Sequence, residues 1–193
     1  MLRRYLATAL IATAAFHLPA RAFGETMAVA ADRQVMLLLK ILTYDRQLES
    51  KAGSELVIGV VSVPSDPDSA RATEAISDTL FGYLKKTVKK LTLQYYLHDY
   101  TTPEKFQAWA KSKKIKVLYI SPGNSKNLAA ILKVSEQLKI TSTTGVPDYV
   151  EKGVAIGIGE RQQRPQILIN LPATKREGSE FDASLLRIAT IVK

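Results

Sequence analysis

Hydrophobic runs alternate with amphipathic stretches along most of the chain. Short continuous runs of apolar and β-branched residues, such as residues 56–61 and 115–120, predict strands buried on both faces, as in a parallel sheet. The predicted strands are residues 56–61, 91–96, 115–120, 140–144, 154–159 and 166–170. Around them, apolar residues recur at helical spacing. The predicted helices are residues 32–52, 69–86, 102–110, 125–138, 172–176 and 182–189, with a loop or single turn at 147–151.

Polar residues mark the starts of several predicted helices. Asp32, Ser69 and Asp182 each stand before a helical pattern, where a side-chain oxygen can accept hydrogen bonds from the first free N–H groups. Thr102 is suited to the same position, and Pro103 follows it at the first helical residue, where proline is favoured. We therefore expect side-chain caps at these four helix starts.

The order of the elements predicts the topology of the sheet. Strands that alternate with helices favour right-handed crossovers and parallel pairing. The short polar connection at residues 161–165 instead favours an antiparallel hairpin between the last two predicted strands. We expect a single-domain α/β fold with a mixed, mostly parallel sheet flanked by helices, a C-terminal β-hairpin and a helical tail.

The first residues follow the pattern of a secretory signal peptide. Arg3 and Arg4 form a short basic region, and residues 5–18 form an apolar core. Ala20 and Ala22 then supply the small-x-small pattern that signal peptidases cleave. The alternative is an uncleaved anchor helix, but the apolar core is short for a span of about 20 residues.

This pattern predicts a signal peptide at residues 1–22, a mature domain at residues 23–193 and a location in the periplasm. Removal of the three arginines in the signal peptide lowers the formal net charge from +9 to +6. Because an exported protein rarely meets nucleic acid, we interpret this charge as a solvated basic surface that can steer an acidic partner, and we expect no nucleic-acid partner. The chain has no cysteine, which excludes disulfides, thiolate metal sites and a cysteine nucleophile.

The C-terminal part of the chain carries a specific series of residues. It reads Asn-Leu-x-Ala from Asn170, then Gly178, then Ser-Leu-Leu-x-x-Ala from Ser184. This series resembles the YfiR family of bacterial periplasmic proteins, and the resemblance is strongest over residues 117–192. The first predicted helix, at residues 36–42, is similar to the opening segment of that family.

The resemblance implies a periplasmic α/β regulator of membrane signalling. The named example of the family represses an inner-membrane diguanylate cyclase, and thereby cyclic-di-GMP signalling, by contacting its periplasmic sensor region. Relatives serve other membrane sensors, including histidine kinases. We therefore expect a cyclase or kinase periplasmic region as partner, together with a homodimer and a possible small-molecule effector. Redox control by cysteine pairs, known in some members, does not apply to this chain.

Patterns typical of enzymes are weak in the mature region. His98 is the one histidine that remains after residue 22, and the adjacent Asp99 would point to the opposite side of a strand. A Ser-His-Asp arrangement needs the histidine between a nucleophile and an orienting acid. We expect a loop histidine with its hydrogen bonds satisfied, and we predict no catalytic residue, no metal site and no cofactor.

Two loops at the carboxyl ends of predicted strands are candidate ligand sites. Backbone N–H groups and hydroxyls at the start of a helix can hold an anion or a carboxylate, although these residues can also simply cap their own helices. The candidate residues are Ser65, Asp66, Ser121, Gly123, Asn124 and Ser125. They support the alternative function, a periplasmic small-molecule (solute) binding module. Trp109 is expected in the core; if exposed, it becomes a candidate interface residue.

Overall fold

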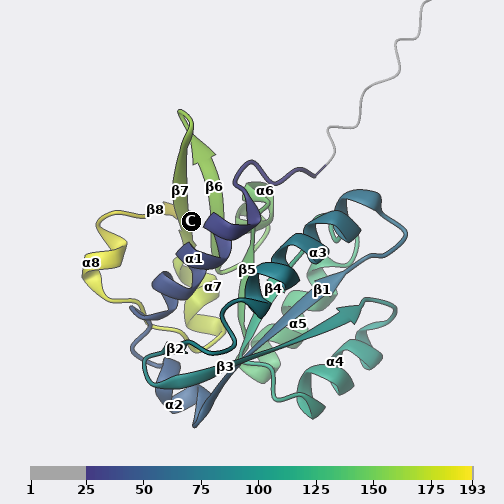
Figure 1. Ribbon diagram of the computed structural model, residues 1–193, viewed down its shortest axis with the longest axis horizontal. Coiled ribbons are helices and arrows are strands. Elements are labelled where there is room, and N and C mark those ends of the chain that lie inside the picture. Colours follow the sequence, from purple (N-terminus) through teal and green to yellow (C-terminus); the bar gives the residue numbers. More distant parts are fainter. Residues whose placement is uncertain (1–24, 193) are drawn as a thin grey trace, which may run out of the picture.

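A single sheet of eight strands organises the computed structural model, which describes residues 25–192 (Figure 1). The predicted signal peptide lies outside the described residues. The strands are β1 (Glu55–Ser62), β2 (Thr87–Val88), β3 (Leu91–Asp99), β4 (Val117–Ile120), β5 (Thr141–Thr144), β6 (Ile156–Arg161), β7 (Arg164–Asn170) and β8 (Thr190–Val192). Their order in the sheet is β2-β3-β1-β4-β5-β6-β7-β8.

The helices pack on both faces of this sheet. They are α1 (Ala31–Leu42), α2 (Leu48–Ala52), α3 (Pro67–Phe81), α4 (Pro103–Ser112), α5 (Leu128–Leu138), α6 (Pro147–Glu151), α7 (Leu171–Arg176) and α8 (Ala183–Leu186). One core lies under α1 and α3, and a second core lies under α4 and α5 (Figure 1). Strand β1 serves both cores, because Ile58 faces the first while Val57 and Val61 face the second.

Pairing within the sheet confirms the predicted mixed, mostly parallel fold. The pairings β3–β1, β1–β4, β4–β5, β5–β6 and β7–β8 are parallel, whereas β2 pairs with β3 in the antiparallel direction. Strands β6 and β7 form the predicted antiparallel hairpin, which extends past the rest of the sheet (Figure 1). Its turn is made by Gln162 and Gln163, both with positive φ, as a two-residue hairpin of this type requires.

Two strands were not predicted. Strand β2 is two residues long and joins β3 through Lys89 and Lys90, which adopt left-handed backbone angles that usually mark glycine or asparagine. Strand β8 covers only three residues at the outer edge of the sheet and follows the terminal helix α8, which ends at Leu186 rather than at residue 189. Helix α3 ends at Phe81 rather than at residue 86, because the chain turns there toward β2.

The predicted caps are partly right. Thr102 accepts a hydrogen bond from the Lys105 N–H, and Asp182 accepts one from the Ser184 N–H. The prediction for Asp32 is wrong, because α1 starts one residue earlier and Asp32 lies in its first turn.

The prediction for Ser69 is also wrong. Asp66 caps α3, while Ser69 is buried inside that helix and its Oγ accepts a hydrogen bond from the Val63 N–H. Neither Asn124 nor Ser125 caps α5, which begins at Leu128 and has no side-chain cap.

Candidate functional site

The carboxyl ends of β1 and β4 meet at a point where the chain changes direction across the sheet. From β1 the chain passes through α3 to β3 on one side. From β3 it returns through α4 to β4 on the other side of β1. In open α/β sheets, ligands bind in the crevice outside such a topological switch point. The six loop residues singled out from the sequence all follow β1 or β4 and therefore lie at this edge.

The two loops touch through Asp66 and Gly123. Gly123 has φ +80°, and a Cβ atom placed on it would lie 2.9 Å from the Asp66 Cγ, so a glycine is needed here. One oxygen of Asp66, Oδ1, accepts hydrogen bonds from the Asp68 and Ser69 N–H groups at 2.9 and 3.0 Å. Asp66 therefore caps α3 and also forms one wall of the crevice.

The other predicted residues have different positions. Ser121 and Asn124 are buried and shape the loop: Ser121 Oγ bonds Thr73 Oγ1 at 2.7 Å, and Asn124 Nδ2 donates to the Ser121 carbonyl at 3.0 Å. Ser65 is exposed, and Ser125 Oγ accepts from the Lys152 ammonium at 3.3 Å on the surface. Of the six predicted residues, Asp66 and Gly123 are thus the two that lie against each other between the loops.

A carboxylate from the chain itself occupies this crevice. The Oε2 atom of Glu25 accepts hydrogen bonds from the Gly123 N–H at 2.6 Å and from the Tyr149 hydroxyl. The pKa of Tyr149 is raised mainly by burial and secondly by the hydrogen bond to Glu25. The hydroxyl therefore stays protonated and donates a hydrogen bond to the Glu25 carboxylate. Sequence reasoning missed Glu25 and Tyr149, because the segment before α1 has no periodic pattern and its contacts span about a hundred residues.

The segment from Glu25 to Ala30 is anchored by Val29, whose side chain is buried in the first core. The Val29 carbonyl accepts a hydrogen bond from Gln34 Nε2 at 2.6 Å, and the Tyr119 hydroxyl lies 3.0 Å from Met27 Sδ. Beside the segment lies a surface cavity of about 480 Å³. The far wall of this cavity is formed by α3 residues and by the loop after β4: Asp68, Arg71, Ala72, Ala75 and Pro122.

His98 and Trp109 form an aromatic stack on the second face of the sheet. Their ring centroids are 4.6 Å apart with planes inclined by 21°, and Trp109 is half-buried. Burial lowers the pKa of His98, which favours the neutral imidazole, and its Nε2 has no hydrogen-bond partner in the part of the chain that the structure describes. Asp99 bonds Ser62 Oγ at 2.9 Å instead of His98. His98 lies within β3 and not in a loop, and its surroundings suit packing better than proton transfer.

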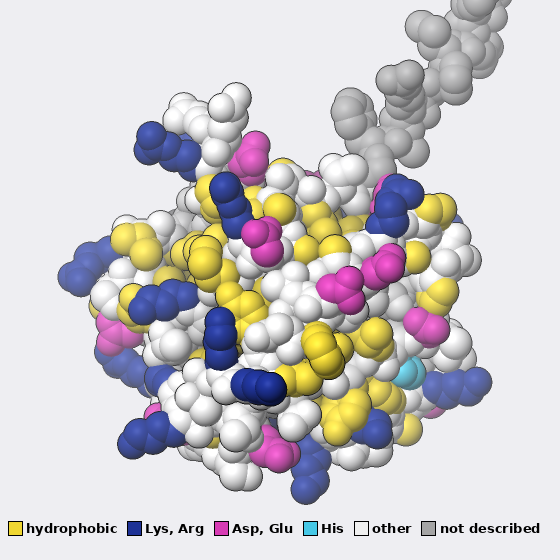
Figure 2. All heavy atoms as spheres, in the orientation of Figure 1, with side chains coloured by type: hydrophobic (Ala, Val, Ile, Leu, Met, Phe, Trp, Pro, Cys, Tyr) yellow, Lys and Arg dark blue, Asp and Glu magenta, His cyan; other side chains and the backbone are white. Residues whose placement is uncertain are grey.

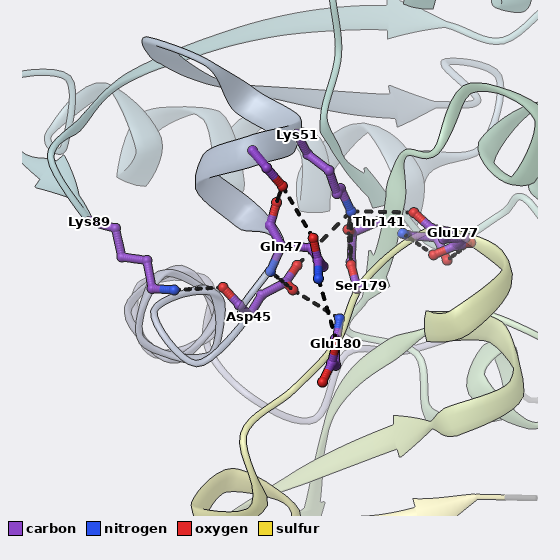
Figure 3. A network of polar contacts seen from close by, with 10 residues as sticks. Asp45, Gln47, Lys51, Lys89, Thr141, Glu177, Ser179 and Glu180 are labelled. Carbon is purple, nitrogen blue, oxygen red and sulfur yellow. Dashed lines mark hydrogen bonds and ion pairs between the residues drawn. The ribbon is translucent and has the colours of Figure 1, made fainter.

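A second polar cluster lies at the opposite end of the strands (Figure 3). The Lys51 ammonium donates to Thr141 Oγ1 at 2.7 Å and to Ser179 Oγ at 2.9 Å, and it lies 4.0 Å from Asp45. The buried Glu177 beside it accepts hydrogen bonds from the backbone N–H and the hydroxyl of Ser142.

Most polar atoms of this cluster bond one another, but Asp45 Oδ2 has no hydrogen-bond partner among the described residues and lies 4.0 Å from the Lys51 ammonium. Burial raises the pKa of Glu177 to about 7, and burial lowers the pKa of Lys51. Asp45 accepts hydrogen bonds from the Gln47 and Glu180 N–H groups, both at 3.0 Å. The cluster therefore attaches the C-terminal segment to α2 and β5 (Figure 3).

The surface carries charged and apolar side chains side by side. Figure 2 shows lysine and arginine side chains around apolar ones on the face that α1 and α3 cover. Among residues 25–192, the exposed large apolar side chains are those of Met36, Phe81, Tyr96, Leu97, Ile188 and Ile191. Across residues 25–192, no helix combines the length and the hydropathy needed to cross a membrane. The same residues contain no group of three or more potential metal ligands.

Solved structures similar to this one are α/β domains of low sequence identity. A conserved domain protein from Vibrio cholerae has a TM-score of 0.58 and 16% identity, over 84% of this chain and 60% of its own. The ABC domain of Streptococcus pneumoniae in complex with L-Trp has a TM-score of 0.53 and 12% identity, over 79% of this chain and 60% of its own.

A substrate-binding protein with adhesive properties from Clostridium difficile, in its ligand-free open form, has a TM-score of 0.52 and 21% identity, over 76% of this chain and 57% of its own. The chain thus spans about three-fifths of each of these structures. At such identities the similarity establishes the fold alone.

Sequence comparison is more specific. No curated protein matches the chain. The family model described as YfiR/HmsC-like matches residues 32–190, which include nearly all of α1, strands β1 to β7 and the helices of the C-terminal tail. The resemblance seen in the Asn170–Ala173 pattern and in the first helix is thereby confirmed. The chain belongs to the YfiR/HmsC-like family.

Proposed function

We propose that this protein is a periplasmic regulator that binds the periplasmic sensor region of an inner-membrane diguanylate cyclase or histidine kinase. The observation that carries this proposal is the family match over residues 32–190, since the family suggests a periplasmic regulator of membrane signalling. The signal-peptide pattern at residues 1–22 supports export. The protein acts by binding and not by turnover, and we also propose that it forms a homodimer.

The free edge of β3 supports a protein partner. Strand β2 pairs only with Leu91 and Thr92, so in the described chain the outer edge of β3 from Leu93 onward has no neighbouring strand. Tyr96 is 38% exposed and Leu97 is 48% exposed along this edge. Unpaired edges with apolar side chains are sites at which a strand of another chain can add to the sheet.

Lys113 and Trp109 frame this edge. The Lys113 ammonium lies 4.6 Å from the centroid of the Tyr96 ring, and Trp109 stacks on His98 next to it. Trp109 thus lies at the border of the proposed surface, where its half-buried ring supports the exposed residues. The net positive charge of the mature chain favours an acidic partner surface.

Regulation follows if the partner has two states and the protein binds one of them better. A shift from 1:99 to 99:1 requires about a 10⁴-fold difference in affinity between the two states. The regulator therefore needs only this difference in binding affinity and no catalytic group.

The decisive experiment measures binding to the periplasmic region of the cyclase or kinase encoded beside the gene, by calorimetry. Leu97→Glu should weaken binding by about thirtyfold, because a buried apolar contact is replaced by a charge. Ile188→Glu, a matched change at the opposite edge of the sheet, should leave Kd unchanged. Sedimentation of both variants separates a partner surface from a dimer surface. Absence of binding, together with unchanged signalling output in a deletion strain, would contradict the proposal.

The alternative function is a small-molecule binding module. The observation that favours it is the crevice between β1 and β4, where a carboxylate oxygen already has two hydrogen-bond donors. A solute that binds the native protein would raise its melting temperature, by an amount that increases with the logarithm of ligand concentration above Kd. A specific solute with this effect, in the absence of any membrane partner, would favour the alternative.

A further inference from the structure

We infer that the crevice between the loops after β1 and β4 is a carboxylate-binding site, and that the Glu25 carboxylate occupies it as a displaceable internal ligand. An external small monocarboxylate then competes with Glu25 for the same two donors. This inference goes beyond the proposed regulation and holds whichever membrane protein the chain binds.

The donors are positioned independently of the segment that contains Glu25. Gly123 lies in a loop fixed by the buried Ser121 and Asn124, which bond Thr73 and the Ser121 carbonyl. Tyr149 belongs to α6 and its side chain packs in the second core. Both donors therefore keep their positions when Glu25 leaves, and the site is preformed.

Departure of Glu25 leaves a gap that another carboxylate fills. Tyr149 is fully buried while Glu25 is in place, so departure of Glu25 removes the acceptor of its hydroxyl, and an external carboxylate can take that position. The cavity of about 480 Å³ between the segment and α3 offers space for the rest of a small ligand. A backbone N–H and a protonated phenol are both donors, and a carboxylate is a pure acceptor that suits this pair.

Contacts that hold the segment are few enough to allow exchange. Thr26 and Ala28 are exposed, and the main anchor, the Val29 side chain buried in the first core, lies at the far end of the segment from Glu25. Between them, Met27 packs against the core and its sulfur lies near the Tyr119 hydroxyl. An external ligand can bind only while Glu25 is out of the site. Its apparent Kd is therefore the intrinsic Kd divided by the fraction of molecules in which the site is open. Removal of Glu25 should thus strengthen binding of the external carboxylate.

Asp66 restricts which anions fit. The Asp66 carboxylate lies against Gly123. The Asp66 charge also contributes, after burial and Glu25, to the raised pKa of Tyr149, so Asp66 is near the hydroxyl that binds the ligand. A second negative charge on the ligand would be repelled at this position. The site is therefore expected to prefer monocarboxylates such as acetate over dicarboxylates such as malonate.

The test follows the Gly123 amide by NMR in uniformly ¹⁵N-labelled protein, with sodium acetate as the probe and sodium chloride at equal ionic strength as the control. In Glu25→Ala, acetate should shift the Gly123 amide saturably, with a Kd about tenfold or more below that of the wild type. Malonate should bind more weakly than acetate. Thr26→Ala, a matched change at the adjacent exposed residue, should behave as the wild type.

Tyr149→Phe in the Glu25→Ala background removes one donor and should weaken acetate binding about fivefold or more. The melting temperature gives a second readout, because acetate should stabilise Glu25→Ala more than chloride does. If acetate and chloride have equal effects on Glu25→Ala in both measurements, or if the wild type and Glu25→Ala bind acetate equally well, the inference is overturned. Neither result bears on binding to a membrane partner, so the two proposals fail separately.

Discussion

Trp109 packs its indole directly over Gly59 in the middle of β1. A Cβ atom placed on Gly59 would lie 2.6 Å from the Trp109 Cη2, well inside van der Waals contact. Ile115 and Leu118 side chains close the same space at 3.1 and 3.2 Å. The strand therefore carries a glycine where a β-branched residue would otherwise be favoured, and α4 can approach the sheet closely.

This contact predicts that Gly59→Ala destabilises the protein by about 1–3 kcal/mol, because the added methyl group overpacks the core. Urea unfolding followed by circular dichroism measures the change. Trp109→Phe in the same chain removes the Cη2 atom and should recover part of the loss. Additive effects of the two substitutions would show that the indole is not the obstacle.

Glu177 predicts a pH dependence of stability. Its pKa is raised by burial from 4.5 to about 7, so the folded state binds a proton that the unfolded state has already lost. The contribution of this group is fully present below pH 4.5 and is lost as pH rises through about 7. Over this window the loss is about 3 kcal/mol.

The matched variant Glu177→Gln cannot titrate. The unfolding free energies of the two proteins should be measured from pH 4 to 8. The stability of the wild type relative to Glu177→Gln should fall as pH rises, so that the two values converge or cross. Glu74→Gln on the exposed face of α3 serves as a control with the same change of charge. A constant difference between wild type and Glu177→Gln over the whole range would contradict the raised pKa.

The central strands could be predicted because their sequence is decided by burial alone. Strand β4, and strand β1 after the exposed Glu55, are buried on both faces, so their positions are apolar or small and the run is visible in the sequence. The edge strands β2 and β8 carry no such pattern. They form because the neighbouring strands β3 and β7 offer hydrogen bonds to them, and this pairing cannot be predicted from the local sequence.

Only part of the candidate site could be predicted from the sequence. Topology alone placed Asp66 and Gly123 at one edge, because parallel neighbouring strands end together. Glu25 could not be found, since the residues before α1 have no helical or strand period and reach Gly123 only in the folded state. Trp109 was expected in the core, and the structure places it half-buried against Gly59.

Gln34 connects this early segment to the core, and its removal should loosen the segment. Its amide donates to the Val29 carbonyl at 2.6 Å and accepts from the Tyr119 hydroxyl at 2.6 Å, with all three groups buried. Gln34→Leu leaves two polar groups without these partners and should cost about 2 kcal/mol or more. Hydrogen exchange at residues 25–30 should become faster.

Two variants test this reasoning. Gln34→Leu combined with Tyr119→Phe removes the stranded hydroxyl and should recover part of the stability. Gln137→Leu on the exposed side of α5 should change the unfolding free energy by less than about 0.5 kcal/mol. Equal losses in Gln34→Leu and Gln137→Leu would show that the buried hydrogen bonds contribute nothing specific.

Asn170, the first residue of the family pattern, has two separate structural roles. Its Oδ1 caps α7 by accepting from the Ala173 N–H at 3.0 Å, and its Nδ2 donates to the buried Val150 carbonyl at 2.9 Å. Asn170→Ala loses both bonds and should destabilise the protein by about 2–4 kcal/mol. Asn170→Ser keeps a capping oxygen and should lose only part of this energy. Thr102→Ala, which removes only the cap of α4, should cost about 1 kcal/mol. If Asn170→Ala costs no more than Thr102→Ala in urea unfolding, the bond to Val150 is not a stabilising contact.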